Sequence, residues 1–345
     1  MREASEYADG GTMRKKPGSL NDVLNKELKD LGGFWSRNDF RPLLIHDSVI
    51  TSRRINLINA WYSTGCAIQR PARGIRSTRK LLRSGERVRI PVTIYEPEGL
   101  GESAPCVVYY HGGAFVLRDR PASHRVAQIY AQTVGCKVIM VHYRVGLPYP
   151  EPLKDCYRGL CWVAENARRL GIDAERIAVL GDSAGAALAA AVTLLARDRK
   201  GPKLCFQMLI SPVTDHRMTS WSMRQYVDSP GWNAGLNRQM WELYLCKTQG
   251  ARPRYAAPLC AESLRGLPPA YVETQEIDCL RDQGNAYADR LSREGVRVEL
   301  NEIRGSYNGY DIHDKNTLVQ LSLHRRCLVL IKEFTREGED GTDML

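Results

Sequence analysis

The fold is decided by one stretch of the chain, Ile177-Ala178-Val179-Leu180-Gly181-Asp182-Ser183-Ala184-Gly185-Ala186-Ala187-Leu188. A short apolar run, the pattern Gly-x-Ser-x-Gly and an alanine-rich run follow one another in it. The apolar run predicts a buried strand, and the alanine-rich run predicts a helix. A serine on a sharp turn between a strand and a helix needs glycine neighbours, because no side chain fits beside it. The stretch therefore predicts a strand–turn–helix unit that presents the Ser183 hydroxyl at the end of a strand.

A second glycine motif, His111-Gly112-Gly113, follows another apolar run, 106–110. Nucleophilic attack on a carbonyl group develops negative charge on its oxygen, and backbone N–H groups placed in advance stabilise that charge. Glycine lets the backbone approach closely, so the N–H groups of Gly112 and Gly113 are candidates for this oxyanion hole. The N–H of Ala184, directly after the serine, is a third candidate. His111 is expected to brace the loop rather than to act as a base.

Apolar runs and helical patterns alternate along the chain. The expected strands are 88–95, 106–110, 137–142, 177–180, 206–210, 270–273 and 296–303. The helical patterns cover 121–135, 151–170, 183–198 and 282–294. Strands that alternate with helices predict an α/β fold, with a mostly parallel central sheet flanked by helices on both faces. Pro91 indicates that the strand 88–95 lies near an edge of the sheet.

Three parts are expected along the sequence. Residues 1–18 are polar and predict a flexible lead-in. Residues 19–85 begin with Ser19, a candidate helix N-cap, and predict an N-terminal helical cap segment. Residues 86–345 form the predicted α/β domain, with a cap insertion at 213–255 that is rich in Trp and Met. With the N-terminal helices, this insertion would cover the carboxyl ends of the strands, where ligands bind in open α/β sheets. Ordinary packing of a helical core explains each of its aromatic residues equally well.

The formal net charge is +10, and basic residues are densest from Arg70 to Arg89. This stretch lacks the interleaved aromatic residues of a single-strand binder and matches no DNA-binding motif. We therefore expect a solvated basic face before a strand, and no nucleic-acid partner. A surface that attracts anionic substrates or lipid headgroups remains an alternative.

Ten cysteines are spread along the chain without a Cys-x-x-Cys pair. Several lie inside apolar patterns, as small buried side chains do. Neither a disulfide framework nor a zinc site is expected, and nothing indicates a metal ion or a cofactor. No apolar run approaches the roughly 20 residues that cross a bilayer, and the N-terminus lacks the apolar core of a signal peptide. We therefore expect a cytoplasmic protein without a transmembrane segment.

From about residue 88 to residue 335, the chain resembles the bacterial branch of the hormone-sensitive-lipase family, the acetyl esterases and lipases. It resembles the plant gibberellin receptors more distantly. The resemblance is carried by the two glycine motifs and by His142-Tyr143-Arg144, Pro150-Glu151-Pro152-Leu153-Lys154-Asp155-Cys156-Tyr157 and Asp278-Cys279-Leu280-Arg281-Asp282. It implies an α/β-hydrolase fold and serine-based hydrolysis of carboxylic esters.

The resemblance also implies that Asp278 is the acid of the catalytic triad. The residues agree, because Asp278 follows the strand 270–273 and comes after Ser183, in the Ser–Asp–His order of this fold. Asp282 competes for the role, but it starts the next helix, which suits it to capping. Asp182 sits inside the serine motif and is expected to be structural.

The family places its catalytic histidine after the last strand, in a His-Gly-Phe or His-Gly-Tyr step. The matching segment reads Gly305-Ser306-Tyr307-Asn308-Gly309-Tyr310-Asp311, so Asn308 occupies that position. An amide can hydrogen-bond to Ser183 but cannot hold a proton at neutral pH. Loss of a triad residue costs on the order of a million-fold in kcat, while the oxyanion hole keeps about a thousand-fold over water. His313 is an alternative base, although five residues from Asn308 it would face another side of a helix.

The sequence therefore predicts hydrolysis of short-chain carboxylic esters through an acyl-Ser183 intermediate, impaired by Asn308. The alternative is a receptor-like protein that binds a small ligand without catalysis. In both cases the partner is a small molecule, an ester substrate or a ligand. The preferred acyl and alcohol groups stay open, and a homodimer is compatible with the sequence.

Overall fold

The structure, a computed structural model, describes residues 50–84, 88–248, 254–312 and 317–336. The predicted flexible lead-in 1–18, the candidate helix start at Ser19 and the alternative base His313 lie outside the described residues. Within the described part of the chain, no helix combines the length and the apolar character needed to cross a membrane.

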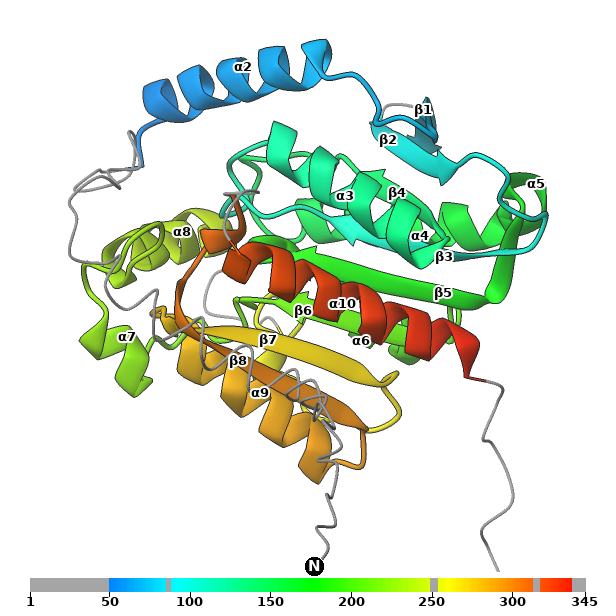
Figure 1. The fold of residues 1–345 in the computed structure, drawn as a ribbon. Coiled ribbons are helices and arrows are strands. Elements are labelled where there is room, and N and C mark those ends of the chain that lie inside the picture. The colour runs from blue at the N-terminus through cyan, green and yellow to red at the C-terminus, as the bar shows by residue number, and fades with distance from the viewer. Residues whose placement is uncertain (1–49, 85–87, 249–253, 313–316, 337–345) are drawn as a thin grey trace, which may run out of the picture. The chain divides into compact units, whose positions relative to one another are not determined.

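The strands form one eight-stranded sheet in the order β1-β2-β4-β3-β5-β6-β7-β8 (Figure 1). They are β1 (Ile75–Ser84), β2 (Val88–Pro97), β3 (Ala104–Tyr110), β4 (Lys137–Val141), β5 (Ile172–Asp182), β6 (Phe206–Ile210), β7 (Ala270–Ile277) and β8 (Val298–Tyr307). β2 runs antiparallel to β1 and β4, and all pairs from β4 to β8 are parallel. The predicted mostly parallel sheet is confirmed.

Helices flank this sheet. They are α2 (Ser52–Ile68), α3 (Pro121–Val134), α4 (Glu151–Glu165), α5 (Ala167–Leu170), α6 (Ala184–Asp198), α7 (Trp221–Gln225), α8 (Ala234–Leu245), α9 (Arg281–Arg293) and α10 (Thr317–Thr335), with short 3₁₀ helices at η2 (Pro258–Cys260) and η3 (Tyr310–Ile312). α3 packs against α10, and α4 packs against α6. Figure 1 shows α10 crossing in front of the middle strands, with α6 behind them. The predicted α/β fold is confirmed.

The core explains why the central strands are continuous apolar runs. Every residue of β4 and of β6 is buried, because helices cover both faces of a parallel sheet. α6 is buried from Ala184 to Ala196, and its alanines let the helix lie close to the strands. This helix starts directly after Ser183, so the best-packed part of the molecule holds the predicted nucleophile.

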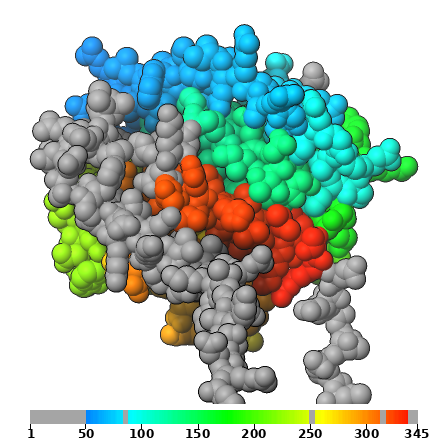
Figure 2. Space-filling model, in the orientation of Figure 1, coloured from blue at the N-terminus to red at the C-terminus, as the bar shows by residue number. Residues whose placement is uncertain are grey.

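β1 departs from the sequence interpretation. Residues 75–84 form a strand that pairs along its whole length with β2, so the helical part of the described N-terminal segment ends at Ile68. Pro91 indicated a strand near an edge of the sheet, and β2 is the second strand from that edge. β4 pairs only with Val92 to Tyr95, so Pro91 lies just outside the part of β2 that is paired on both sides. Exposed side chains from Arg76 to Leu81 gave β1 no apolar alternation to recognise. In Figure 2 the blue atoms of α2 lie at the surface of the molecule.

The segment between β6 and β7 breaks the alternation of strands and helices, as expected. It contains α7 and α8. Trp232, Met240 and Trp241 are buried, whereas Trp221 is exposed. The insertion is therefore a packed helical layer with its own apolar contacts.

Candidate active site

Ser183 occupies a sharp turn between β5 and α6. Its backbone lies in the left-handed region, at φ 55° and ψ −119°, which a residue with a side chain rarely adopts. The Ser183 N–H donates to the carbonyl oxygen of Ile210 at the end of β6, with an N···O distance of 2.7 Å. Two strands thus hold the turn in a strained conformation, as occurs at functional sites.

The glycines on either side of Ser183 are required by close packing. A Cβ atom on Gly181 would lie 2.2 Å from the carbonyl oxygen of Gly185. A Cβ atom on Gly185 would lie 2.0 Å from the carbonyl oxygen of Tyr110, the last residue of β3. The serine turn and the end of β3 are therefore in direct backbone contact.

The loop after β3 packs on this turn. A Cβ atom on Gly112 would lie 2.4 Å from a carboxylate oxygen of Asp182. Gly113 has φ 128°, and its carbonyl oxygen accepts hydrogen bonds from the N–H groups of Val116 and Leu117 at 3.0 and 2.8 Å. The structure thus brings Gly112, Gly113 and the serine turn together at the carboxyl ends of β3 and β5.

His111 lies inside the packing of this loop. Its buried ring stacks on Tyr143, with ring centroids 4.5 Å apart and an angle of 13° between the planes. Nδ1 contacts the Gly112 carbonyl oxygen at 2.7 Å, and the Tyr143 hydroxyl donates to the His111 carbonyl oxygen at 2.7 Å. Burial lowers the pKa of His111. Through these contacts His111 holds the loop in place.

Asp182 joins three segments beside the serine. Its Oδ1 accepts a hydrogen bond from the hydroxyl of Tyr109 at 2.7 Å, and its Oδ2 accepts one from Arg120 at 3.4 Å. Tyr109 belongs to β3, and Arg120 is the residue before α3. Asp182 therefore fastens the serine turn to its neighbours, and its position in the sequence motif gives no sign of these partners.

Asp278 and Asn308 are brought together at the other side of the site. Asp278 follows β7 directly and is fully buried, and Asn308 follows the neighbouring strand β8. Asn308 Nδ2 donates to Asp278 Oδ2 at 3.0 Å, and the Leu280 N–H donates to Asp278 Oδ1 at 3.0 Å. Burial raises the pKa of Asp278 to about 6, although both hydrogen bonds oppose the shift. Asn308 thus bonds to Asp278, the residue predicted to be the triad acid.

Hydrogen bonds and ion pairs hold the loop that carries Asn308. The hydroxyl of Tyr310 donates to Glu273 Oε1 at 3.1 Å. Arg326 of α10 donates from Nε to Glu273 Oε2 at 3.0 Å and from Nη1 to Asp311 Oδ2 at 2.9 Å. Arg326 and Glu273 are buried, so this ion pair is shielded from solvent. The position of Asn308 is consequently determined by β7 and α10 as well as by β8.

The insertion between β6 and β7 touches the same site. A Cβ atom on Gly231 would lie 2.4 Å from the carbonyl oxygen of Asn308. Asp282 Oδ2 accepts a hydrogen bond from the N–H of Ser222, in the first turn of α7, at 2.7 Å. Ser222 Oγ accepts one in return from the Asp282 N–H at 3.1 Å. Asp282 therefore caps α7 from its place in α9.

A cavity of about 660 Å³ opens beside the glycine loop. It is lined by Asn59 of α2, Ala114 and Phe115 of the loop, and Met240 and Tyr244 of α8, among other residues. Ser183, Asp278 and Asn308 are absent from its described lining, so the cavity adjoins the reactive groups without containing them. α2 and α8 form opposite walls.

The left-handed serine between the fifth strand of such a sheet and its following helix defines the molecule as an α/β-hydrolase. Comparison with known proteins gives the same class. A family described as having the alpha/beta hydrolase fold matches residues 107–311.

Curated relatives extend the comparison. The chain is 38% identical over 231 residues to the carboxylesterase NlhH of Mycobacterium tuberculosis, covering 64% of this chain and 71% of that protein. It is 34% identical over 245 residues to an arylesterase of Saccharolobus solfataricus, covering 70% and 79%. The crystal structure of the esterase LipW from Mycobacterium marinum superimposes with a TM-score of 0.76 at 31% identity, covering 84% of this chain and 92% of that chain. The chain belongs to the α/β-hydrolase family, in the branch related to hormone-sensitive lipase, and these relatives are esterases.

Proposed function

We propose that the protein hydrolyses small carboxylic esters through an acyl-Ser183 intermediate, at a rate that Asn308 keeps low. Ser183 Oγ attacks the ester carbonyl carbon, the bond to the alcohol breaks, and water then releases the acid from the serine. The N–H groups of Gly112, Gly113 and Ala184 stabilise the negative charge that develops on the carbonyl oxygen.

One observation carries this proposal. Asn308 Nδ2 donates to Asp278 at 3.0 Å, which supports placing the amide where the base would stand. Neither the amide oxygen nor the remaining N–H of Asn308 takes up a proton at neutral pH, so the amide cannot act as a base for Ser183. The serine turn and the glycine loop still supply the part of catalysis that needs no base, about a thousand-fold over water.

The surroundings suit a small apolar ester. On the side of α8 and of the glycine loop the cavity is lined by apolar side chains such as Phe115 and Met240, and on the side of α2 by polar ones such as Asn56 and Asn59. α7, α8 and α2 serve in this proposal as the cap over the site. All ten cysteines are free thiols, which fits the expected cytoplasmic location. No cofactor is needed for the reaction.

The proposal is tested with p-nitrophenyl acetate on three purified proteins, the unmodified chain, Asn308→His and Ser183→Ala. We expect slow release of nitrophenol by the unmodified chain and a large gain in Asn308→His. Ser183→Ala should show only the background rate. The double variant Asn308→His with Ser183→Ala should also fall to background, because the gain requires the acyl-serine.

A receptor-like protein is the second candidate, and the neutral amide at the base position favours it. A binding protein needs the pocket and the ordered loops but no proton carrier. If Asn308→His is folded and shows no gain over the unmodified chain, the site is remodelled for binding and the esterase proposal is wrong.

A further inference from the structure

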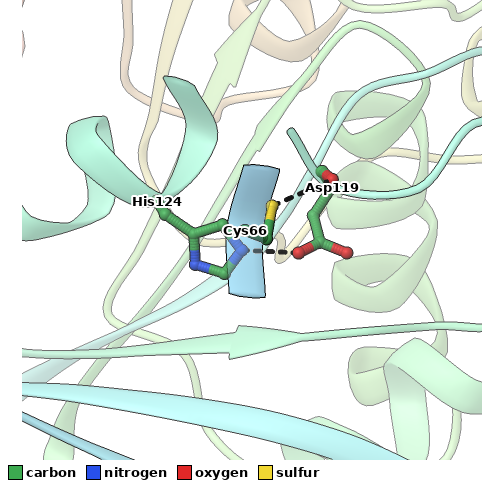
Figure 3. Close-up of side chains that lie close together, drawn as sticks. All are labelled: Cys66, Asp119 and His124. Carbon is green, nitrogen blue, oxygen red and sulfur yellow. Dashed lines mark hydrogen bonds and ion pairs between the residues drawn. The ribbon is translucent and has the colours of Figure 1, made fainter. Parts of the chain in front are cut away.

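Three metal-binding side chains meet at a seam that is separate from Ser183, and a fourth side chain, His142, contacts one of them. Cys66 belongs to α2, Asp119 follows the glycine loop, His124 belongs to α3 and His142 follows β4. One donor atom each of Cys66, Asp119 and His124 lies within 4.8 Å of the others (Figure 3). His124 Nε2 is 2.5 Å from Asp119 Oδ2, and His142 Nδ1 is 3.3 Å from Asp119 Oδ1. Both rings and the thiol are thus gathered around one carboxylate.

In each histidine the second ring nitrogen is also hydrogen-bonded. The remaining ring nitrogen of His124, Nδ1, is hydrogen-bonded to the hydroxyl of Tyr95. The remaining nitrogen of His142, Nε2, is 2.8 Å from the hydroxyl oxygen of Thr93. Tyr95 and Thr93 are two residues apart on β2, so one face of the strand orients both rings. Histidines that bind metal ions are oriented in this way, with one nitrogen on the metal and the other on a hydrogen-bond partner.

A hydrogen-bonded network would explain Asp119, His124 and His142 without any metal. Cys66 is the residue that such a network does not need. Its Sγ contacts the carbonyl oxygen of Asp119 at 3.5 Å and lies beside the Asp119 carboxylate and the His124 ring (Figure 3). Thiolate, imidazole and carboxylate are the three ligand types that zinc prefers.

We propose that Cys66, Asp119 and His124 bind one zinc ion, with His142 holding the Asp119 carboxylate, and that the ion fastens α2 to the α/β body. On binding, the Cys66 thiol releases its proton to solvent, and the thiolate and the carboxylate balance the two positive charges of the ion. Burial and the Asp119 carboxylate raise the pKa of the Cys66 thiol, and the Arg79 guanidinium only partly opposes them, so the thiolate forms when the cation binds. Cys-x-x-Cys spacing gave no sign of this site, because its donors come from three separate segments.

The site would matter for α2 because this helix has few other attachments. Ile58 is its one buried residue among those described, and Asn59 joins it to the loop through Val116 and Arg118 at 3.1 and 2.8 Å. Cys66 lies two turns further on, near the carboxyl end of the helix. A metal ion there would hold the second end of α2, which lines the cavity beside the glycine loop.

A second cluster provides the control. Asp215, His216 and Cys260 also place three donor atoms within 4.8 Å. There the carboxylate is already paired with Arg217 at 2.8 Å, and the cluster has a single histidine. The cysteine of each cluster is half-buried. Cys66→Ser and Cys260→Ser are therefore matched variants that differ in the site they alter.

The test uses the full chain, freed of metal with a chelator and dialysed. Zinc is titrated in competition with a chromophoric chelator. We expect one equivalent to bind to the unmodified chain and to Cys260→Ser, and binding at least about tenfold weaker in Cys66→Ser, the size of effect that perturbing a zinc site produces. Circular dichroism of the metal-free proteins shows whether each variant is folded.

Cobalt supplies a readout that a structural role alone would not move. Co²⁺ bound to a thiolate shows a sulfur-to-metal charge-transfer band in the near ultraviolet. We expect this band in the unmodified chain and in Cys260→Ser, and its absence in Cys66→Ser. Absence of zinc binding to the folded, unmodified chain would overturn the proposal. Equal binding by folded Cys66→Ser, or loss of binding in Cys260→Ser, would overturn it as well.

Discussion

The Ser183 side of the active site and its Asp278 side are built by different means. Around Ser183, backbone meets backbone, and Gly112, Gly181 and Gly185 leave no room for a side chain. Around Asp278, side chains meet through hydrogen bonds, and Asn308 is one of them. A backbone contact is lost when any side chain is added, whereas a hydrogen-bonded position accepts another polar side chain of similar reach. The site can therefore lose its proton carrier while its geometry stays intact.

The largest expected effect comes from restoring the proton carrier. Asn308→His should raise kcat for p-nitrophenyl acetate by at least about a thousand-fold, about 4 kcal/mol of barrier, since loss of the base costs a serine hydrolase still more. The imidazole would donate to Asp278 and present its other nitrogen to Ser183. Steady-state kinetics at neutral pH measure the gain. A gain that persists after Ser183→Ala would show that the new histidine acts independently of the serine.

The next effect tests the backbone side. Gly185→Ala should lower the free energy of unfolding by about 3 kcal/mol or more, because its Cβ would overlap backbone atoms of β3 that cannot move aside. Gly101→Ala is the control, since nothing lies within 4 Å of its Cβ and the substitution should change stability little. Urea unfolding gives both values. Equal stability of the two variants would contradict the close packing described for the serine turn.

The pH dependence of stability tests the Asp278 side. The folded-state pKa of about 6 exceeds the usual value for an aspartate, so the folded protein keeps a proton that the unfolded chain releases. The resulting stabilisation, about 3 kcal/mol at most, is fully present below about pH 4 and is lost as the pH rises through 6. Unfolding of the unmodified chain and of Asp278→Asn is compared from pH 4 to pH 7. The stability difference between them should change across this window, and a constant difference would contradict the raised pKa.

The smallest effects come from two tyrosine hydroxyls, one on each side. Tyr109→Phe removes the hydrogen bond to Asp182 Oδ1 and should cost about 1–3 kcal/mol, because the carboxylate keeps only the longer contact to Arg120. Tyr310→Phe removes a hydrogen bond to Glu273. Because Glu273 keeps its ion pair with Arg326, this variant should lose less stability than Tyr109→Phe. Thermal unfolding of the two variants gives the comparison. A larger loss of stability in Tyr310→Phe would show that Glu273 depends on its tyrosine more than Asp182 does.

The Ser183 side could be predicted from the sequence because its determinants are local. The apolar run, the glycines and the alanine-rich helix stand within about a dozen residues, and each has one structural solution. The Asp278 side needed the resemblance to a family. Thirty residues separate Asp278 from Asn308, and only the adjacency of β7 and β8 makes them neighbours.

Other features left no pattern to detect. The side chains of β1 from Arg76 to Leu81 are exposed, so this part of its sequence resembles a solvated segment. Asp282 was expected to cap a helix, but its capping partner is Ser222, 60 residues earlier. No sequence motif singles out the metal-binding residues of the proposed zinc site. Their common carboxylate, Asp119, becomes visible only when α2, α3 and β4 are assembled.

β1 gives the basic stretch a physical role. Among the described strands it is the outermost of the sheet, and no described strand pairs with its outer side, to which another strand could bind. Arg76, Arg79 and Lys80 are exposed along it. When two copies approach through this edge, the same positive charges meet, and their repulsion opposes the growth of one sheet across two molecules. The charge that invited a search for an anionic partner would thus also act between identical molecules, as a repulsion that high salt weakens.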